Sequence, residues 1–420
     1  MRQDWFDEAR FGLFVHFGIY SVAGRHEWVQ SRERLTDAEY LPYFENFDPD
    51  RFDAAAIARR ATATGMGYVV LTTKHHDGFC LWDSALTDFT SVAVSGRDLV
   101  REYVDALRAE GLKVGLYHSL LDWHHPDFTV DENHPRREDD VAALNEGRDM
   151  ARYREYLHGQ VRELLTDYGQ IDYLFFDFSY AEGMEGWTGK GPTDWGSEEL
   201  LAMCRELQPD MLVNDRLGIP ADFVTPEQYQ PTAPLMTDGV QQVWEACQTL
   251  NGSWGYDRDN TDQKSAAMLV EMLADSVSMD GNMLLNVGPD GRGAIAPRDQ
   301  RTLDEIGEWM ALHRDAIVGA GHAGFTAPRE GVYTRRGDRL YLHLFSWPMG
   351  AVHLPGLASR VRFARLLNDG SWLRTSVIDP GQQASYLTPA GEAEGTLTVH
   401  LPARRPEVLM PVIELRLTGE

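Results

Sequence analysis

A carboxylate at the end of an apolar run is the residue best placed to do chemistry. Asp177 follows Leu174, Phe175 and Phe176 in the segment 173–178. A charge there costs free energy unless it is paired, hydrogen-bonded or used in a reaction. The carboxyl ends of parallel barrel strands carry active sites, so Asp177 is a candidate catalytic group. The alternative is an N-cap or loop aspartate just beyond a strand.

Two pairs of adjacent histidines follow predicted strands or stand in loops. His75 and His76 come just past the apolar run 68–73, and His124 and His125 stand farther along the chain. Adjacent side chains diverge in an extended chain, so such a pair rarely binds one metal ion. For the first pair we therefore favour recognition of a polar ligand over a metal site or a structural role. For the second pair we favour a loop role.

Tryptophans lie beyond the predicted strands or in loops, where they are not simply core residues. They are Trp28, Trp82, Trp123 and Trp254. Aromatic side chains combine a flat apolar face with a polar edge, which suits the C–H faces of sugars. Together with strand-end carboxylates, they favour a neutral polyhydroxylated ligand.

This ligand class suggests glycoside hydrolysis, which needs two carboxyl groups. One lies beside the anomeric carbon, and the other protonates the leaving oxygen. Asp177 is the first candidate. Glu227 and Glu245 both follow the apolar run 211–214, and spacing does not decide between them.

Composition excludes several classes of protein. The chain has 420 residues, with 39 Lys or Arg against 65 Asp or Glu, and a net charge of −26. So acidic a chain repels phosphate backbones and anionic membranes, so we expect no nucleic-acid partner and no membrane partner. No apolar run approaches the ~18 residues of a membrane span.

The cysteines indicate a reducing compartment. Cys80, Cys204 and Cys247 are odd in number, and their spacing matches no zinc motif. Residues 1–10 lack the apolar stretch of a secretory signal, so we expect a cytoplasmic location, or a secreted one if a leader was removed. The oligomeric state stays open, a homo-oligomer included.

Apolar runs alternate with amphipathic segments over ~300 residues, which is typical of a (β/α)-barrel or a doubly wound sheet. The predicted strands are 11–17, 68–73, 114–118, 173–178, 211–214 and 283–287. The predicted helices are 53–64, 97–110, 144–167, 198–207, 263–279 and 298–315.

The composition changes near Gly319. Beyond it, apolar residues alternate with polar ones, as in 397–401 and 413–417. This alternation predicts an antiparallel β-sandwich of ~90 residues. The acidic stretch 131–140 is expected to be a solvated loop.

These residues resemble the retaining α-L-fucosidases of glycoside hydrolase family 29. The matching segments run in the family's order and are 10–18, 27–28, 74–79, 176–177, 214–216, 244–247, 253–256 and 281–293. The resemblance implies a TIM-type (β/α)8-like barrel, regular or irregular, over residues 1–322. A C-terminal antiparallel β-sandwich over 323–420 would follow, and neither a metal nor another cofactor is implied.

The resemblance also implies roles for individual residues. Asp177 resembles the nucleophile, and Glu227 is the favoured acid/base, with Glu245 as the fallback or, instead, as a residue that shapes the substrate pocket. Trp254 resembles the wall facing the fucose methyl group. The implied contacts to sugar hydroxyls are His16, Glu27, Trp28, His75, His76, Arg216 and either Tyr117 or His118.

The expected reaction is hydrolysis of terminal α-L-fucosyl groups from oligosaccharides or glycoconjugates by double displacement. One residue departs from the family pattern, because Phe178 stands where many relatives have glycine after the nucleophile. Alternatives are the same fold acting on a related α-L-glycoside such as an α-L-galactoside, a non-catalytic carbohydrate-binding protein, and a metal-dependent hydrolase.

Overall fold

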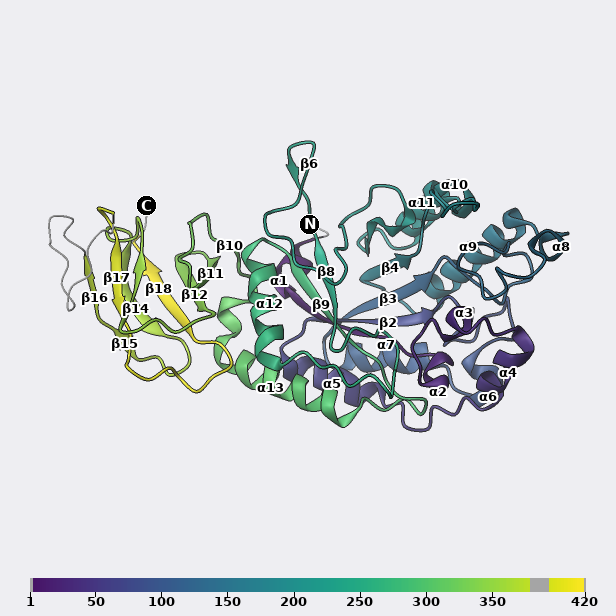
Figure 1. Ribbon diagram of the computed structural model, residues 1–420, viewed down its shortest axis with the longest axis horizontal. Helices are drawn as coiled ribbons and strands as arrows, with labels where there is room; N and C mark the ends of the chain where they lie inside the picture. The colour runs from purple at the N-terminus through teal and green to yellow at the C-terminus, as the bar shows by residue number, and fades with distance from the viewer. Residues whose placement is uncertain (1–2, 378–392, 419–420) are drawn as a thin grey trace.

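The computed structural model describes residues 3–377 and 393–418. Figure 1 shows an elongated molecule, with a parallel sheet and its helices at one end and antiparallel sheets at the other. The parallel sheet has seven strands. In spatial order they are β5 (Leu212–Val213), β4 (Tyr173–Asp177), β3 (Lys113–Ser119), β2 (Tyr68–Lys74), β1 (Phe11–Val15), β9 (Asn282–Val287) and β8 (Glu245–Thr249).

The strands form the wall of an irregular TIM-type barrel, and alternate residues face its two sides. One apolar cluster fills the interior and includes Phe14, Tyr117 and Phe175. A second cluster lies between strands and helices and includes Leu116 and Leu174. Because both sides are buried, these strands appear as continuous apolar runs in the sequence.

The wall is completed by a segment that is not a regular strand. β5 and β8 are the edges of the seven-stranded sheet. Between them, Phe223 bridges Asn214, and Glu227 bridges Cys247 in β8, both in parallel. The segment 223–227 therefore takes the place of a barrel strand and carries Glu227 to the rim.

Helices cover the outside of the sheet, and their ends follow the capping rules. The side chain of Asp53 accepts a hydrogen bond from the Ala56 amide at the start of α5 (Ala54–Thr64), which ends at Gly65 with φ +86°. The other long helices are α7 (Leu99–Ala109), α9 (Met150–Asp167), α11 (Ser197–Leu207), α12 (Ala266–Ser278) and α13 (Pro297–His313).

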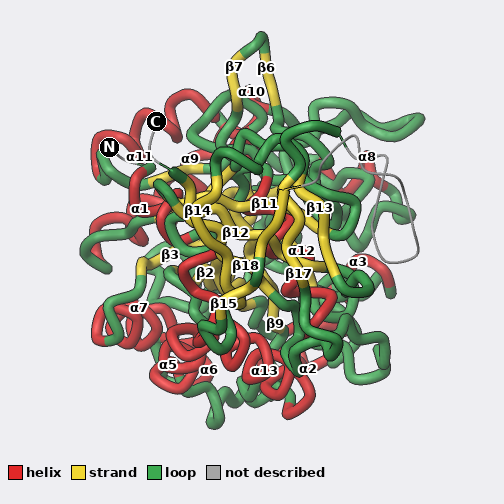
Figure 2. The backbone as a smooth tube through the Cα atoms, turned by 90° about the vertical axis from the view of Figure 1, so that its left-hand side faces the viewer, coloured by secondary structure: helices red, strands yellow, loops and turns green. Residues whose placement is uncertain are grey.

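Short helices lie mostly in the connections. They are α1 (Asp4–Ala9), α2 (Tyr20–Ala23), α3 (Val29–Arg32), α4 (Asp37–Glu45), α6 (Ser91–Ser95), α8 (Val141–Asn145), α10 (Pro192–Trp195), η1 (Asp215–Leu217) and η2 (Arg314–Ala316). A hairpin of β6 (Met236–Thr237) and β7 (Val240–Gln241) projects from the barrel in both Figures 1 and 2.

Two antiparallel sheets follow the barrel (Figure 2). The larger contains β10 (Gly321–His322), β11 (Gly331–Arg336), β12 (Arg339–Leu344), β18 (Val412–Leu417), β14 (Val361–Leu366) and β15 (Trp372–Leu373). The smaller contains β13 (Ala351–Leu354), β17 (Leu397–His400) and β16 (Thr375–Val377). They share an apolar core that includes Leu342, Leu354 and Val399. This is the C-terminal sandwich expected from the sequence.

Two sequence expectations were wrong in detail, and one strand was not predicted. The helix predicted at 144–167 is broken between α8 and α9, where Asp149 caps the second helix by accepting from the Ala151 amide. The strand β8 was not predicted, because its sequence Glu-Ala-Cys-Gln-Thr lacks an apolar run. The stretch 131–140 is not a uniformly solvated loop, since Asp131 is buried against Lys190.

Candidate active site

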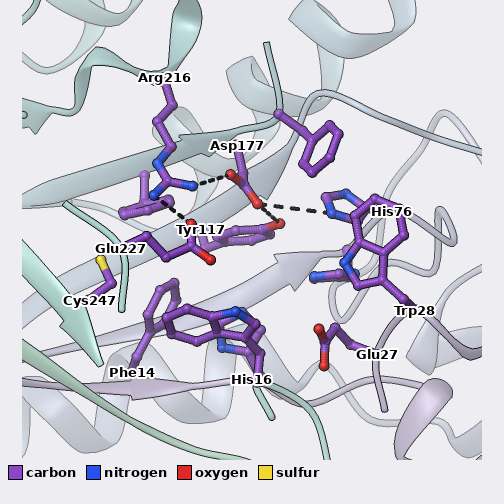
Figure 3. Close-up of a pocket in the computed structure, with 14 residues that line it drawn as sticks. Phe14, His16, Glu27, Trp28, His76, Tyr117, Asp177, Arg216, Glu227 and Cys247 are labelled. Carbon is purple, nitrogen blue, oxygen red and sulfur yellow. Dashed lines mark hydrogen bonds and ion pairs between the residues drawn. The ribbon is translucent and has the colours of Figure 1, made fainter. Parts of the chain in front are cut away.

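A pocket opens at the carboxyl ends of the barrel strands. Its lining comprises Phe14, His16, Glu27, Trp28, His75, His76, Tyr117, Phe175, Asp177, Phe178, Arg216, Glu227, Cys247 and Trp254. β1, β2, β3, β4 and β8 each deliver residues within the strand or just beyond it. Figure 3 shows Arg216 beside Asp177 and Glu227, with His76, Trp28 and Glu27 across the pocket.

Asp177 is held as an anion at the end of β4. Its Oδ2 accepts a hydrogen bond from the Tyr117 hydroxyl at 2.8 Å, and its Oδ1 accepts one from Arg216 Nη1 at 2.8 Å. His76 Nε2 lies 4.0 Å from Oδ2. Burial alone would raise the pKa of Asp177, but the Arg216 guanidinium and the Tyr117 hydrogen bond outweigh it and lower that pKa below its ordinary value.

Glu227 shares the same guanidinium. Arg216 Nη2 donates to Glu227 Oε2 at 2.8 Å, while Arg216 Nε donates to Thr225 Oγ1. The Glu227 side chain is 41% exposed, against 14% for Asp177. One carboxyl thus lies deep and charge-stabilised, and the other lies close by and open to solvent. Burial lowers the pKa of Arg216, but Asp177 and Glu227 outweigh this effect and raise that pKa above its ordinary value. The guanidinium therefore stays charged.

His16 is fixed in one tautomer by Asn286. The Asn286 Nδ2 donates to the Trp254 carbonyl at 2.7 Å, so its Oδ1 is the acceptor that faces His16 Nδ1 at 2.6 Å. His16 therefore carries its proton on Nδ1 and keeps a lone pair on Nε2. Burial lowers the pKa of His16 to about 3, so the ring is neutral.

His76 is fixed in the same way by Ser119. The Ser119 hydroxyl donates to the Leu121 carbonyl at 2.9 Å, so it accepts from His76 Nδ1 at 2.7 Å. Burial lowers the pKa of His76 to about 4. The bare Nε2 faces the Asp177 carboxylate. A hydroxyl hydrogen is the partner this nitrogen requires.

Glu27 presents a second unpaired acceptor. Its Oε2 accepts from the Gly255 amide at 2.7 Å, while its buried Oε1 has no hydrogen-bond partner among the described residues. The nearby His26 Nδ1 already accepts from the Trp28 amide and cannot donate. Burial raises the pKa of Glu27 to about 7. An unpaired buried acceptor in a pocket fits a hydroxyl-bearing ligand.

Aromatic rings form the remaining walls. The Trp254 ring lies 5.3 Å from the His16 ring and 6.0 Å from the Phe14 ring. His75 stacks on Tyr117 with ring centroids 5.6 Å apart. These contacts fix the rings in place, and they leave an apolar surface at Trp254.

Two predicted site residues do not line the pocket. His118 lies next to Tyr117 in β3 and faces the opposite side of the strand, where its Nδ1 lies 3.2 Å from Thr73 Oγ1. Glu245 lies at the start of β8, deep inside the barrel. It accepts from the Tyr173 hydroxyl at 2.6 Å and from the Tyr68 hydroxyl. Burial raises the pKa of Glu245 to about 7.

Several site residues were missing from the sequence predictions. Phe14, Phe175 and Cys247 line the pocket. Ser119 and Asn286 are not part of its lining, but they hydrogen-bond to His76 and His16, which are. The alternation of strand residues could have found Phe14, which lies two residues before His16. Nothing in the sequence indicates which polar side chain supports which histidine.

The described ranges 3–377 and 393–418 contain no group of three or more His, Cys, Asp or Glu side chains that could hold a metal ion. Within the same ranges, no helix has the length and apolar character to cross a membrane. Cys80, Cys204 and Cys247 are buried free thiols.

Sequence comparisons identify the family. Residues 1–315 match the family described as Alpha-L-fucosidase. The tissue α-L-fucosidase of Bos taurus is 31% identical over 380 residues, which cover 82% of this chain and 75% of the bovine protein. The plasma α-L-fucosidase of Rattus norvegicus is 32% identical over 345 residues, covering 74% and 70%.

Solved structures are similar over the whole chain. The α-L-fucosidase isoenzyme 1 from Paenibacillus thiaminolyticus is 44% identical, with a TM-score of 0.91, and the match covers 100% of this chain and 99% of that one. A GH29 α-L-fucosidase from Bacteroides thetaiotaomicron, described as a trapped covalent intermediate with 2-fluoro-fucosyl fluoride, is 26% identical. Its TM-score is 0.84, with coverage of 100% and 96%.

Proposed function

The chain belongs to the α-L-fucosidase family, and we propose that Asp177 is its nucleophile and Glu227 its acid/base. The enzyme is a retaining α-L-fucosidase that acts on a fucosylated substrate. The observation that best supports the two assignments is the Arg216 bridge, which brings an ionised carboxylate and an exposed carboxyl to one guanidinium (Figure 3).

In the first step Asp177 attacks the anomeric carbon while the bond to the leaving oxygen breaks. Glu227 gives its proton to that oxygen, so the leaving group departs as a neutral alcohol. In the second step Glu227 takes a proton from water, and the resulting nucleophile releases fucose from Asp177. The low pKa of Asp177 keeps the nucleophile ionised.

The pocket side chains suit the hydroxyls and the methyl group of fucose. His16 and His76 present Nε2 lone pairs, so each accepts a hydrogen bond from a sugar hydroxyl. Because His76 Nε2 lies 4.0 Å from Asp177 Oδ2, its partner is the hydroxyl on the carbon next to the anomeric carbon. Trp254 supplies an apolar wall for the methyl group. We propose Glu27, Trp28 and His75 as further fucose contacts because they line the same pocket.

The test is release of 4-nitrophenol from 4-nitrophenyl α-L-fucoside by wild type and by Asp177→Ala. We expect the variant to lose on the order of 10³-fold or more of turnover. Azide should restore part of it and give the inverted fucosyl azide. Undiminished turnover in the variant would reject Asp177 as the nucleophile. The α-L-galactoside alternative is tested with the matching galactoside, which should be a poorer substrate because its C6 hydroxyl meets the apolar wall.

We also propose that residues 1–322 form the catalytic unit and 323–420 the sandwich. A separate apolar cluster that begins at Ala323 supports this division. We propose a cytoplasmic location, supported by the three buried free thiols, with short fucosylated oligosaccharides as substrates. Fractionation of the native organism tests the location.

A further inference from the structure

A second cavity adjoins the fucose pocket. It shares Asp177, Phe178, Arg216 and Glu227 with that pocket and continues along Tyr180, Asp215 and Thr225. We call this second cavity the leaving-group groove. Its volume is about 490 Å³, against about 70 Å³ for the pocket.

The two proposed catalytic carboxyls stand at the junction of the two cavities. A fucosyl ring in the pocket would place the bond to be cleaved at this junction, and the leaving group would extend into the groove. Glu227 lines both cavities and is 41% exposed, so its carboxyl reaches the side on which the leaving oxygen departs.

Phe178 lines both cavities, and its backbone is strained. Its φ is +78°, a region that bulky side chains rarely adopt. The ring is held by Trp28, His76 and Tyr180, with ring centroids 5.1, 5.0 and 5.5 Å away. A strained backbone next to a nucleophile, fixed by three rings, indicates that the position of this ring is used.

The Tyr180 side chain is also held in place by its neighbours. Its hydroxyl donates to Asp131 Oδ2 at 2.6 Å, and Asp131 is buried against Lys190. The Tyr180 and Phe178 rings meet edge to face at 72°. The groove therefore has a rigid aromatic side, the kind of surface on which the C–H face of a sugar packs.

The charge of the groove excludes one class of leaving group. Asp177, Asp215 and Glu227 contribute three carboxyls, and Arg216 is the sole Lys or Arg among the described residues that line the groove. Arg216 is already engaged by Asp177 and Glu227. A carboxylated or sulfated leaving group would meet net repulsion there.

We propose that this groove binds the leaving group, that it selects a neutral sugar over an anionic one, and that Phe178 is the residue against which this sugar packs. The proposal rests on the roles assigned to Asp177 and Glu227.

The experiment compares two substrates that differ in how far they extend. α-L-Fucosyl fluoride has a one-atom leaving group and leaves the groove empty, whereas a neutral fucosyl-galactose disaccharide fills it. Phe178→Gly and Phe178→Leu are measured on both. Glycine adopts φ +78° without strain, and leucine keeps bulk without an aromatic face.

For both variants we expect the ratio of kcat/KM on the disaccharide to kcat/KM on the fluoride to fall on the order of tenfold relative to wild type. Equal losses on both substrates would mean that Phe178 shapes the fucose pocket, and no loss on either would mean that the leaving group misses its ring. Both results would overturn the proposal. Loss of fluoride hydrolysis in Asp177→Ala tests the catalytic assignment separately.

The charge selection has its own test. 4-Nitrophenyl fucoside is compared with its 3-carboxylated counterpart at low salt. We expect the carboxylated compound to have a kcat/KM roughly fivefold lower, and both added salt and Asp215→Asn to narrow that gap. Equal or faster turnover of the carboxylated compound would overturn the claim of selection against anions.

Discussion

Arg216 donates a hydrogen bond to Asp177 over 2.8 Å, and the opposite terminal nitrogen of the same guanidinium donates to Glu227 over the same distance. A planar guanidinium presents two separate terminal nitrogens in a fixed geometry, which an ammonium does not. The contact serves two purposes, because it fixes the spacing of the two carboxyls and keeps the inner one ionised.

The first prediction concerns the acidic limb of the pH profile. Arg216→Gln removes the cation that lowers the pKa of Asp177, so that pKa rises. Since the nucleophile must be ionised, activity should be lost at a higher pH as the solution is acidified. The measurement is kcat/KM for 4-nitrophenyl fucoside from pH 3 to 8. If the acidic limb of the variant lies at the same pH as that of the wild type, Arg216 does not set the ionisation of Asp177.

The second prediction separates the two candidate acids. Glu227→Ala should retain much of its rate on 4-nitrophenyl fucoside, whose leaving group needs little protonation. On an alkyl fucoside or a disaccharide it should lose ~10²–10⁴-fold, the usual contribution of a general acid. Wild-type rates on the disaccharide would remove Glu227 from this role.

The third prediction tests the tautomer of His76. Ser119→Ala removes the acceptor for His76 Nδ1–H, so the ring is free to place its proton on Nε2. Turnover of 4-nitrophenyl fucoside should fall by roughly tenfold, about the value of one hydrogen bond. Turnover of the 2-deoxy substrate should fall much less, because it lacks the hydroxyl proposed to bind His76.

Ser119→Thr keeps the hydroxyl and serves as the matched control for this prediction. It should restore most of the rate on both substrates. An equal loss on the normal and the 2-deoxy substrate in Ser119→Ala would indicate general damage to the site.

The fourth prediction concerns stability. The pKa of Glu245 is raised by burial from 4.5 to about 7, so the folded protein binds a proton that the unfolded chain releases in this interval. Its contribution to stability therefore falls as the pH rises from about 4.5 to 7. Glu245→Gln cannot ionise, so its Tm relative to wild type should increase between pH 5 and pH 8.

The same variant should hydrolyse the disaccharide at a rate within a few-fold of wild type, because Glu245 lies below the pocket. Thermal unfolding at several pH values is the measurement. A Tm difference that is independent of pH would mean that Glu245 is ionised in the fold. If Glu245→Gln loses much activity on the disaccharide but not on 4-nitrophenyl fucoside, Glu245 becomes a candidate for the acid/base again.

Much of the barrel could be predicted from the sequence, because strands buried on both sides leave continuous apolar runs. The run predicted at 68–73 corresponds to β2, and 283–287 to β9. The strand β8 was not predicted because its sequence Glu-Ala-Cys-Gln-Thr contains neither an apolar run nor a regular alternation of apolar and polar residues. The segment 223–227 was not predicted as part of the barrel wall because it pairs with its neighbours through isolated bridges and not as a regular strand.

For the site, the types of residue could be predicted, but their depth and orientation could not. Tyr117 and His118 are neighbours in sequence, and the strand turns them to opposite faces. Glu227 and Glu245 both follow β5, yet one lies at the rim and the other near the floor of the barrel. Only the pairing of Glu245 with Tyr68 and Tyr173 at the starts of β2 and β4 reveals that depth.

The pairing of β1 with β9 has a consequence for how the enzyme is made. Phe11 pairs with Met283, and His16 depends on Asn286 for its proton position. These contacts join residues about 270 positions apart, and such non-local contacts form late in folding. A chain still emerging from the ribosome therefore carries Asp177 and Glu227, the proposed nucleophile and acid, before Asn286 has been synthesised. We expect activity to appear only after β9 has docked beside β1, because that docking brings Asn286 to His16.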